Sequence, residues 1–337
     1  MPAMPTRQIG PFTVSAMGLG CMNLHHAYGK GVDDAYGAKL LNAALDDGVR
    51  FLDTAALYGA GKNEQLIGKA VMHRRQDFIL ASKCVLDFRD GARILDGRPE
   101  SISRTLDEAL LRLNTDMIDL YYLHRLDRQV PIEESVGALA RAVEAGKIRA
   151  IGVSEMSAAT LRRAHATHPI AAIQNEYAPW VRNSDVAVME TCRELGIGFV
   201  AFSPVGRGFL AGSIRGGQFE PGDLRALWPR FSPENLPHNL QLLDRFCTLA
   251  AEIGITPAQL ALAWVLHQAP FIVPIPGTRR IERVLENNAA VHVRLTADQI
   301  AMVDEIFKPG AVRGRRYPPD MQAIVDTELL PEELADQ

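Results

Sequence analysis

The sequence lacks any apolar run that approaches the ~18 residues of a membrane-spanning helix. Its first ten residues, MPAMPTRQIG, contain no apolar stretch of the kind found in a secretory signal peptide. From both absences we expect a cytoplasmic protein that does not associate with a membrane.

Cysteine is scarce, and no two cysteines have the spacing of a metal site. The four cysteines are Cys21, Cys84, Cys192 and Cys247. Isolated cysteines are typical of free thiols in a reducing compartment, so we expect no disulfide framework and no bound metal.

Clusters of positive charge are also missing. Lysine and arginine alternate with aspartate and glutamate along the chain, and the formal net charge is -4. A broad nucleic-acid surface requires clustered basic residues, so we expect no nucleic-acid partner.

Short apolar runs alternate regularly with longer segments of helical period. Near-continuous apolar character is typical of strands buried on both faces of a parallel sheet. The runs occupy residues 14–20, 50–55, 78–83, 117–124, 148–154, 170–177, 197–204 and 271–277. Eight alternations predict an α/β protein with one (β/α)8 TIM barrel domain over residues 1–337. We expect a short N-terminal β-hairpin, a long loop at about 210–235 and an irregular C-terminal tail at about 308–337.

Polar residues stand where the predicted strands end, and these ends meet at the active face of such a barrel. They are Asp53, Lys83, His124, Ser154, Gln174 and Ser203. Tyr58 follows in the loop after the second strand, within RFLDTAALYG. A lysine ammonium near Tyr58 favours the phenolate and would lower its pKa from about 10. With a carboxylate to orient the lysine and an imidazole beside the phenol, the set can protonate a carbonyl oxygen.

Each of these residues also has a purely structural interpretation. Asp53 can cap a turn, and Lys83 can end a strand in solvent. His124 can be a hydrogen-bonded core histidine, and Tyr58 can simply pack. Their occurrence together on adjacent strand ends favours the chemical interpretation.

The same stretches resemble the aldo-keto reductase family, in a branch of bacterial and plant reductases. The resemblance extends from RQIGPFTVSAMGLGCM to PIPGTRRIERVLENN and includes GVRFLDTAALYGAGKNEQLIGKA, ILASK and IDLYYLH. It implies a catalytic tetrad of Tyr58, Asp53, Lys83 and His124, with Tyr58 as the general acid. It also implies a nicotinamide coenzyme extended across the barrel mouth, in agreement with the absence of a GxGxxG motif after a predicted strand.

Coenzyme contacts follow from the resemblance, position by position. In GVS and IQNEY, Ser154 and Gln174 would hold the carboxamide, and Phe202 would replace the usual tyrosine against the nicotinamide. Thr278, Arg279 and Arg280 suit a 2'-phosphate at a helix start, which favours NADPH over NADH; a solvated pair of arginines is the alternative. The implied set is Gly20, Cys21, Met22, Asp53, Ser154, Gln174, Phe202, Ser203, Pro204, Gly206, Arg207, Gly208, Pro276, Gly277, Thr278, Arg279, Arg280, Asn287 and Asn288.

Glu155 departs from the family, which often has asparagine there. Its charge either alters how the nicotinamide end is held or points away from it. The expected substrate pocket consists of Met22, Tyr58, Phe88, His124, Arg125 and Trp180. An aromatic and apolar lining favours aryl or medium-chain aldehydes. For Trp180 and Trp228, pocket and packing roles are both open, and Arg125 can bind a carboxylated substrate or pair with Asp127. Trp264 has the spacing of a core residue.

The resemblance therefore implies an NADPH-dependent oxidoreductase that reduces a small carbonyl compound, as a monomer or homo-oligomer. Two other functions are considered. One is an NADPH-sensing subunit with slow or no turnover, like the potassium-channel β-subunits. The other is a lyase in which Lys83 forms a Schiff base, which an adjacent Asp53 opposes by keeping the lysine protonated.

Overall fold

Eight parallel strands form the central sheet of the computed structural model, which describes residues 3–89 and 92–335. In chain order they are β3 (Leu19–Gly20), β4 (Phe51–Asp53), β5 (Ile79–Cys84), β8 (Ile118–Leu123), β9 (Ile148–Ser154), β10 (Ile170–Glu176), β11 (Gly198–Phe202) and β12 (Ile272–Pro274). The sheet curls until its two ends meet, where the backbone N–H of Gly18 donates to Pro274 O at 3.0 Å. The predicted (β/α)8 barrel is confirmed.

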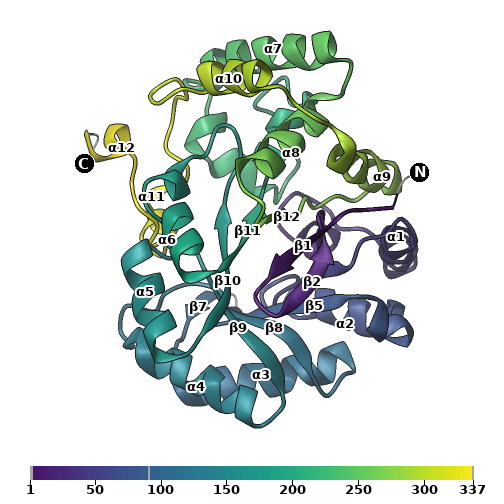
Figure 1. The fold of residues 1–337 in the computed structure, drawn as a ribbon, viewed down its shortest axis with the longest axis vertical. Coiled ribbons are helices and arrows are strands. Elements are labelled where there is room, and N and C mark those ends of the chain that lie inside the picture. Colours follow the sequence, from purple (N-terminus) through teal and green to yellow (C-terminus); the bar gives the residue numbers. More distant parts are fainter. Residues whose placement is uncertain (1–2, 90–91, 336–337) are drawn as a thin grey trace.

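Helices surround the barrel, and the last two, which are short, belong to the C-terminal tail (Figure 1). They are α1 (Asp34–Asp46), α2 (Lys62–Ala70), α3 (Pro99–Leu113), α4 (Ile132–Glu144), α5 (Ala158–Thr167), α6 (Val188–Leu195), α7 (Leu236–Ile253), α8 (Pro257–Gln268), α9 (Ile281–Ala289), α10 (Ala297–Ile306), α11 (Pro319–Gln322) and α12 (Pro331–Ala335). The α3 helix shows how sequence sets these limits. Pro99 occupies its first turn, where a missing N–H costs nothing, and Asn114 ends it in a left-handed conformation.

The first predicted strand is divided between two structures. Phe12–Ser15 forms β2, which pairs antiparallel with β1 (Thr6–Ile9), and only Leu19–Gly20 joins the barrel. This hairpin was expected. Its Phe12 and Val14 pack with Leu120 and other side chains that fill the barrel interior. The hairpin therefore belongs to the hydrophobic core inside the barrel.

A second hairpin was not expected. β6 (Leu86–Arg89) and β7 (Ala92–Leu95) pair antiparallel directly after β5, with Leu86 opposite Leu95. Charged residues interrupt the apolar pattern of this segment, so it showed neither strand nor helix period.

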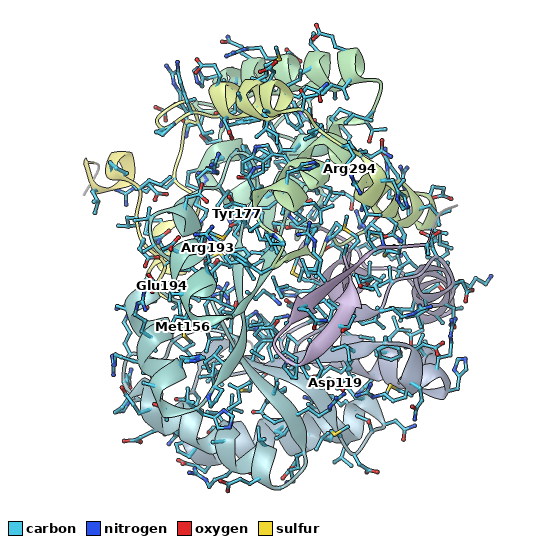
Figure 2. The ribbon with its side chains drawn as sticks, in the orientation of Figure 1. Asp119, Met156, Tyr177, Arg193, Glu194 and Arg294 are labelled. Atoms are coloured by element: carbon cyan, nitrogen blue, oxygen red, sulfur yellow. The ribbon has the colours of Figure 1, made fainter. Side chains whose placement is uncertain are left out.

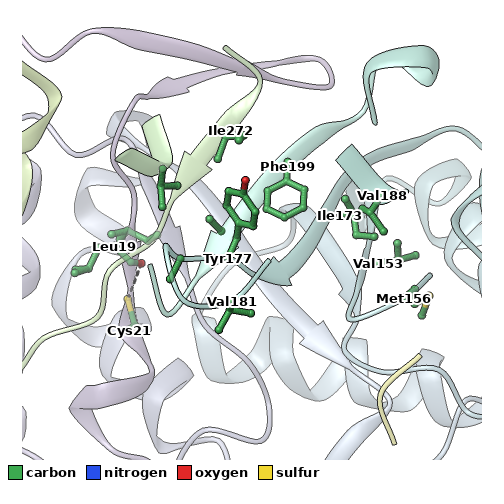
Figure 3. Packing of buried hydrophobic residues seen from close by; sticks show 14 of the residues in the cluster. Leu19, Cys21, Val153, Met156, Ile173, Tyr177, Val181, Val188, Phe199 and Ile272 are labelled. Carbon is green, nitrogen blue, oxygen red and sulfur yellow. Dashed lines mark hydrogen bonds between the residues drawn. The ribbon is translucent and has the colours of Figure 1, made fainter. Parts of the chain in front are cut away.

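A second hydrophobic layer lies between the sheet and the helices. Figure 3 shows Tyr177 and Phe199 facing each other there, with ring centroids 5.6 Å apart in an edge-to-face arrangement. The ring of Trp264 on α8 lies 5.5 Å from that of Tyr177 and is fully buried, as its helical spacing indicated. This layer fixes the outer helices and therefore the loops that leave the strand ends.

The described residues contain no single helix that is long and apolar enough to span a membrane. The α7 and α8 helices meet the length and composition criteria only together, as a pair bent by 86°. In the same part of the chain, no group of three histidine, cysteine or acidic side chains is placed to hold a metal ion.

A buried ion pair fixes the C-terminal tail to the barrel. Arg316 donates from Nη1 and Nη2 to Glu155 Oε1 and Oε2, at 3.1 and 2.8 Å, and both side chains are almost fully buried. Arg316 also donates to Thr327 Oγ1 at 2.8 Å, and the backbone N–H of Asp326 donates to Glu155 O at 3.0 Å. Burial opposes the charge of Glu155, but Arg316 holds the pKa of this carboxyl below its ordinary value.

Replacing Arg316 should therefore loosen the tail. Arg316→Met leaves the buried Glu155 carboxylate without its main partner and should lower the free energy of unfolding by about 3–5 kcal/mol. Urea denaturation measures this loss. Arg313→Met, at an exposed position three residues earlier, is the control and should change stability by no more than ~0.5 kcal/mol. Equal effects of the two variants would contradict a structural role for the ion pair.

Candidate active site

Lys83 lies at the centre of the strand-end residues. It is fully buried in β5, and its Nζ donates to the Asp53 carboxylate on the adjacent strand β4. The same ammonium donates to Thr54 O at 2.8 Å and to Tyr58 Oη at 3.3 Å. The parallel pairing places Asp53 beside Ala81, so Lys83, two residues further on, points to the same side.

Burial and the charge of the partner oppose each other in this buried pair. Burial favours the neutral lysine, but Asp53 and Tyr58 outweigh it and raise the pKa of Lys83. Burial also raises the pKa of Asp53, against the opposing effects of Lys83 and Gln174. Gln174 Nε2 donates to Asp53 Oδ2 at 2.8 Å, so the carboxylate is held from two sides. This carboxylate orients Lys83 toward the phenol.

Tyr58 differs from expectation in its acidity. Burial raises the pKa of its phenol, and the opposing effect of Lys83 does not reverse this. The expected net lowering is therefore wrong, because desolvation of the phenolate outweighs the nearby ammonium. The ring of His124 lies edge-on to that of Tyr58, with the ring centroids 5.9 Å apart. Burial holds the pKa of this imidazole well below its ordinary value. His124 is consequently neutral beside a protonated phenol.

A cavity of about 440 Å³ opens over these side chains. Asp53, Tyr58 and His124 line one part of it, while Lys83 lies behind them. The other predicted site residues that line it are Gly20, Met22, Arg125, Ser154, Gln174, Phe202, Ser203, Pro204, Arg207, Gly208, Gly277, Thr278, Arg279, Arg280 and Asn287. The structure thus brings together most residues of the implied coenzyme and substrate sets.

Besides Lys83, six predicted residues lie outside the cavity lining: Cys21, Phe88, Trp180, Gly206, Pro276 and Asn288. Phe88 is 48% exposed on the second hairpin. Trp180 is stacked on Phe209 at 4.4 Å, so it packs, whereas Trp228 lines the cavity. Asn288 donates to Asp47 Oδ2 at 2.8 Å.

The loop after β11 has an unusual backbone. Ser203, Gly206, Arg207 and Gly208 all have positive φ, between 50° and 90°. At Gly206 a Cβ atom would lie 2.6 Å from Trp180 Nε1, so only glycine fits. Arg207 is already engaged here: its guanidinium pairs with the buried Glu176 and lies 3.8 Å from the centre of the Trp228 ring. This side chain therefore forms part of the cavity wall.

Glu155 points away from the cavity and toward Arg316 of the tail. Of the two interpretations given to this departure from the family pattern, the structure shows the second. The carboxylate binds the tail, and it also accepts from the backbone N–H of Glu176 at 2.8 Å.

Sequence reasoning missed several lining residues. His26 is stacked near Tyr58, with ring centroids 5.9 Å apart. Leu86 and Arg93 come from the second hairpin, and Tyr317, Met321 and Ile324 come from the tail. None of these segments has a strand or helix period, so only their tertiary position reveals them. The one available signal was the density of aromatic and basic residues in GRRYPPDMQ.

Comparison with known proteins identifies the family of the chain. Residues 16–308 match the model of the Aldo/keto reductase family. The chain is 42% identical to the aldo-keto reductase yakc of Schizosaccharomyces pombe, whose name specifies NADP(+), over 98% of this chain and 99% of that protein. It is also 42% identical to the probable aldo-keto reductase 1 of Glycine max, over 91% and 89%.

A solved structure gives the same result for the fold. The glycerol dehydrogenase from Gluconobacter oxydans superposes with a TM-score of 0.83 at 28% identity, over 95% of this chain and 99% of that one. The family match spans most of the chain, and it includes the strand ends from which the buried lysine, acid, phenol and imidazole extend. The chain belongs to the aldo/keto reductase family.

Proposed function

We propose that the chain reduces an aldehyde or ketone to an alcohol with NADPH, and that Tyr58 is the general acid. The observation that carries the proposal is the contact of Tyr58 Oη with Lys83 Nζ at 3.3 Å, beside His124 and at the wall of the cavity. A buried lysine held charged against a phenol is an arrangement suited to proton donation.

The residues at the other part of the cavity fit a phosphorylated dinucleotide. Thr278, Arg279 and Arg280 line it just before α9 begins at Ile281. Among the described residues neither arginine has a carboxylate partner, and Arg279 donates only to Lys30 O. Two unpaired guanidiniums and a hydroxyl at a helix start match a 2'-phosphate, which distinguishes NADPH from NADH. When bound, NADPH supplies the hydride that reduces the carbonyl carbon.

Side chains of the protein itself donate the proton and stabilise the charge that remains. Because the pKa of Tyr58 is raised, its phenol keeps the proton at neutral pH and can donate it to the oxygen as negative charge develops there. The ammonium of Lys83 then stabilises the phenolate that remains. Neutral His124 donates a hydrogen bond from its ring to the same oxygen and so orients the carbonyl.

The lyase alternative is not favoured. A Schiff base requires a neutral amine that attacks the carbonyl, whereas Asp53 and Tyr58 raise the pKa of Lys83. The sensor alternative keeps the same coenzyme contacts and differs in turnover. A coenzyme titration followed by oxidation of bound NADPH with a panel of aldehydes and ketones separates the two: binding without turnover favours the sensor.

Tyr58→Phe removes the proposed acid and little else. We expect kcat for aldehyde reduction to fall roughly 10²–10⁴-fold, while the Kd for NADPH changes only a few-fold. Tyr121→Phe is the matched control, since its hydroxyl is also buried but lies away from the cavity. Near-normal turnover by Tyr58→Phe would exclude the assigned role.

The pH dependence of reduction follows from the same groups. A general acid must be protonated, so activity is present below its pKa and is lost as pH rises through it. Since the pKa values of Tyr58 and Lys83 are both raised, kcat/KM should stay flat through neutral pH and fall only above the ordinary phenol value of about 10. Stopped-flow rates in buffers of constant ionic strength measure this. A single ionisation that abolished activity between about pH 7 and 9 would contradict the assignment.

Coenzyme preference tests the phosphate site. Arg279→Ala combined with Arg280→Ala should weaken NADPH binding at least about tenfold, the size of one hydrogen bond to a charged group. NADH affinity should remain within a few-fold, because NADH lacks the 2'-phosphate. Fluorescence titration gives both constants. Arg294→Ala is the control, because Arg294, labelled in Figure 2, is exposed and does not line the cavity. Equal losses for the two coenzymes would show that these arginines do not bind the 2'-phosphate.

A further inference from the structure

Arg125 is a buried cation at the catalytic end of the cavity. It follows His124 directly in the chain and lines the cavity together with His124 and Tyr58. Only 9% of it is exposed. Its Nη1 donates to His124 O at 2.7 Å and reaches Ser154 Oγ at 3.5 Å, so the guanidinium lies between the ends of β8 and β9.

No carboxylate neutralises this guanidinium within the described part of the chain. Asp127, the pairing partner considered from the sequence, uses its carboxylate to accept from the backbone N–H groups of Gly97 and Gln129, each at 2.9 Å. Glu155 is near enough to interact electrostatically with Arg125, but its two oxygens are bound by Arg316. The Nε of Arg125 is buried and has no hydrogen-bond partner among the described residues. A buried cation with unused donors is costly unless a partner binds to it.

The rest of the cavity leaves this charge unbalanced. Among the described residues that line it, Asp53 is the only acid, and Lys83 already neutralises it. The lining arginines Arg207 and Arg225 have their own acids, Glu176 and Asp223. Arg279 and Arg280 are unpaired too, but they belong to the loop before α9, whereas Arg125 adjoins the catalytic His124. Of the other lining arginines, Arg283 pairs with Glu286, and Arg93 is exposed, although it also acts electrostatically on His124. Among the described lining residues, Arg125 is therefore the buried cation without a carboxylate partner beside the proposed acid and imidazole.

We propose that Arg125 is an anion-binding subsite and that the physiological substrate is an aldehyde or ketone bearing a carboxylate or phosphate group. This inference rests on the proposed carbonyl reduction. With the carbonyl oxygen at Tyr58 and His124, the guanidinium of Arg125 binds the anionic group through a donor that His124 O and Ser154 do not use. The spacer between carbonyl and anion is short, because Arg125 is the chain neighbour of His124. An aryl or medium-chain aldehyde that has no anionic group would leave this cation unpaired.

The test compares anionic carbonyl compounds with neutral counterparts. Succinic semialdehyde and 4-carboxybenzaldehyde are each measured against their methyl esters, and glyceraldehyde 3-phosphate is measured against glyceraldehyde. The unmodified protein should favour the anionic member in kcat/KM by about 10- to 100-fold, mainly through KM, as expected for one hydrogen-bonded charge. The carboxylate and phosphate pairs show which anion is preferred.

Variants locate the preference. Arg125→Met should bring the anionic-to-neutral ratio of kcat/KM close to one, and Arg125→Lys should restore part of it. Arg93→Met is the control, because Arg93 also lines the cavity but is exposed, and its loss should change the ratio by less than about threefold. Circular dichroism shows whether Arg125→Met folds. If it does not fold, the proposal is tested by the ratio of kcat/KM in the unmodified protein and in Arg125→Lys. A ratio near one in the unmodified protein, or one that Arg125→Met leaves unchanged, overturns the proposal.

A binding measurement separates this subsite from the proposed reaction. Isothermal titration of the unmodified protein with 4-hydroxybutanoate and with its methyl ester requires no turnover. Tighter binding of the acid, lost in Arg125→Met, supports the anion subsite even if no aldehyde is reduced, a result that would refute only the reductase function. Reduction of every aldehyde without regard to charge, together with equal binding of acid and ester, supports the reductase and refutes the subsite.

Discussion

Lys83 has no exposed surface, and this single constraint organises the barrel mouth. An ammonium group in such a position requires an adjacent negative charge and further acceptors, which Asp53 and Thr54 provide from the neighbouring strand and its loop. Removal of either charge would leave the other buried and unpaired. The contact therefore ties β4 to β5 as well as positioning the phenol of Tyr58, whose oxygen is another acceptor for the ammonium. Stability and proposed chemistry depend on the same pair.

A second set of charges extends from the barrel to the tail. Glu155 and Glu176 follow or end neighbouring strands, and Arg316 and Arg207 reach them from the tail and from the loop after β11. These ion pairs fix the tail and the loop after β11, segments whose sequences have no helical or strand period, to the barrel. Tyr317 and Met321 of the tail thereby become cavity walls. The carboxylate at position 155 thus anchors the tail through Arg316.

Much of the fold was predictable, because the apolar runs and the segments of helical period between them follow directly from which residues are buried. The strand-end side chains followed from the barrel geometry, so Asp53, Lys83, His124 and Tyr58 were placed correctly as neighbours. The second hairpin was not predictable, because its charged residues mask any strand period. The acidity of Tyr58 was misjudged for a different reason: sequence showed the nearby lysine, but the degree of burial that opposes it exists only in three dimensions. Position 119 illustrates the same limit. Asp119 on β8 (Figure 2) accepts from Arg75 and Arg149 at 2.6 and 2.8 Å, so this strand carboxylate has a structural role. Asp53, also on a strand, instead binds Lys83, which contacts the phenol of Tyr58.

The pattern of paired and unpaired charges carries information that neither composition nor net charge contains. Across the whole chain the formal net charge is only -4, yet the described lining of the cavity is rich in arginine and contains a single acid. Among the lining arginines, Arg207 and Arg225 have a structural role, and each has its own carboxylate. Arg125, Arg279 and Arg280 have no carboxylate partner among the described residues, so each leaves a charge that a ligand could neutralise. Arg125 lies beside the proposed proton donor, and the other two lie before α9. An extended anionic coenzyme would account for the pair before α9 and would leave Arg125 to the substrate.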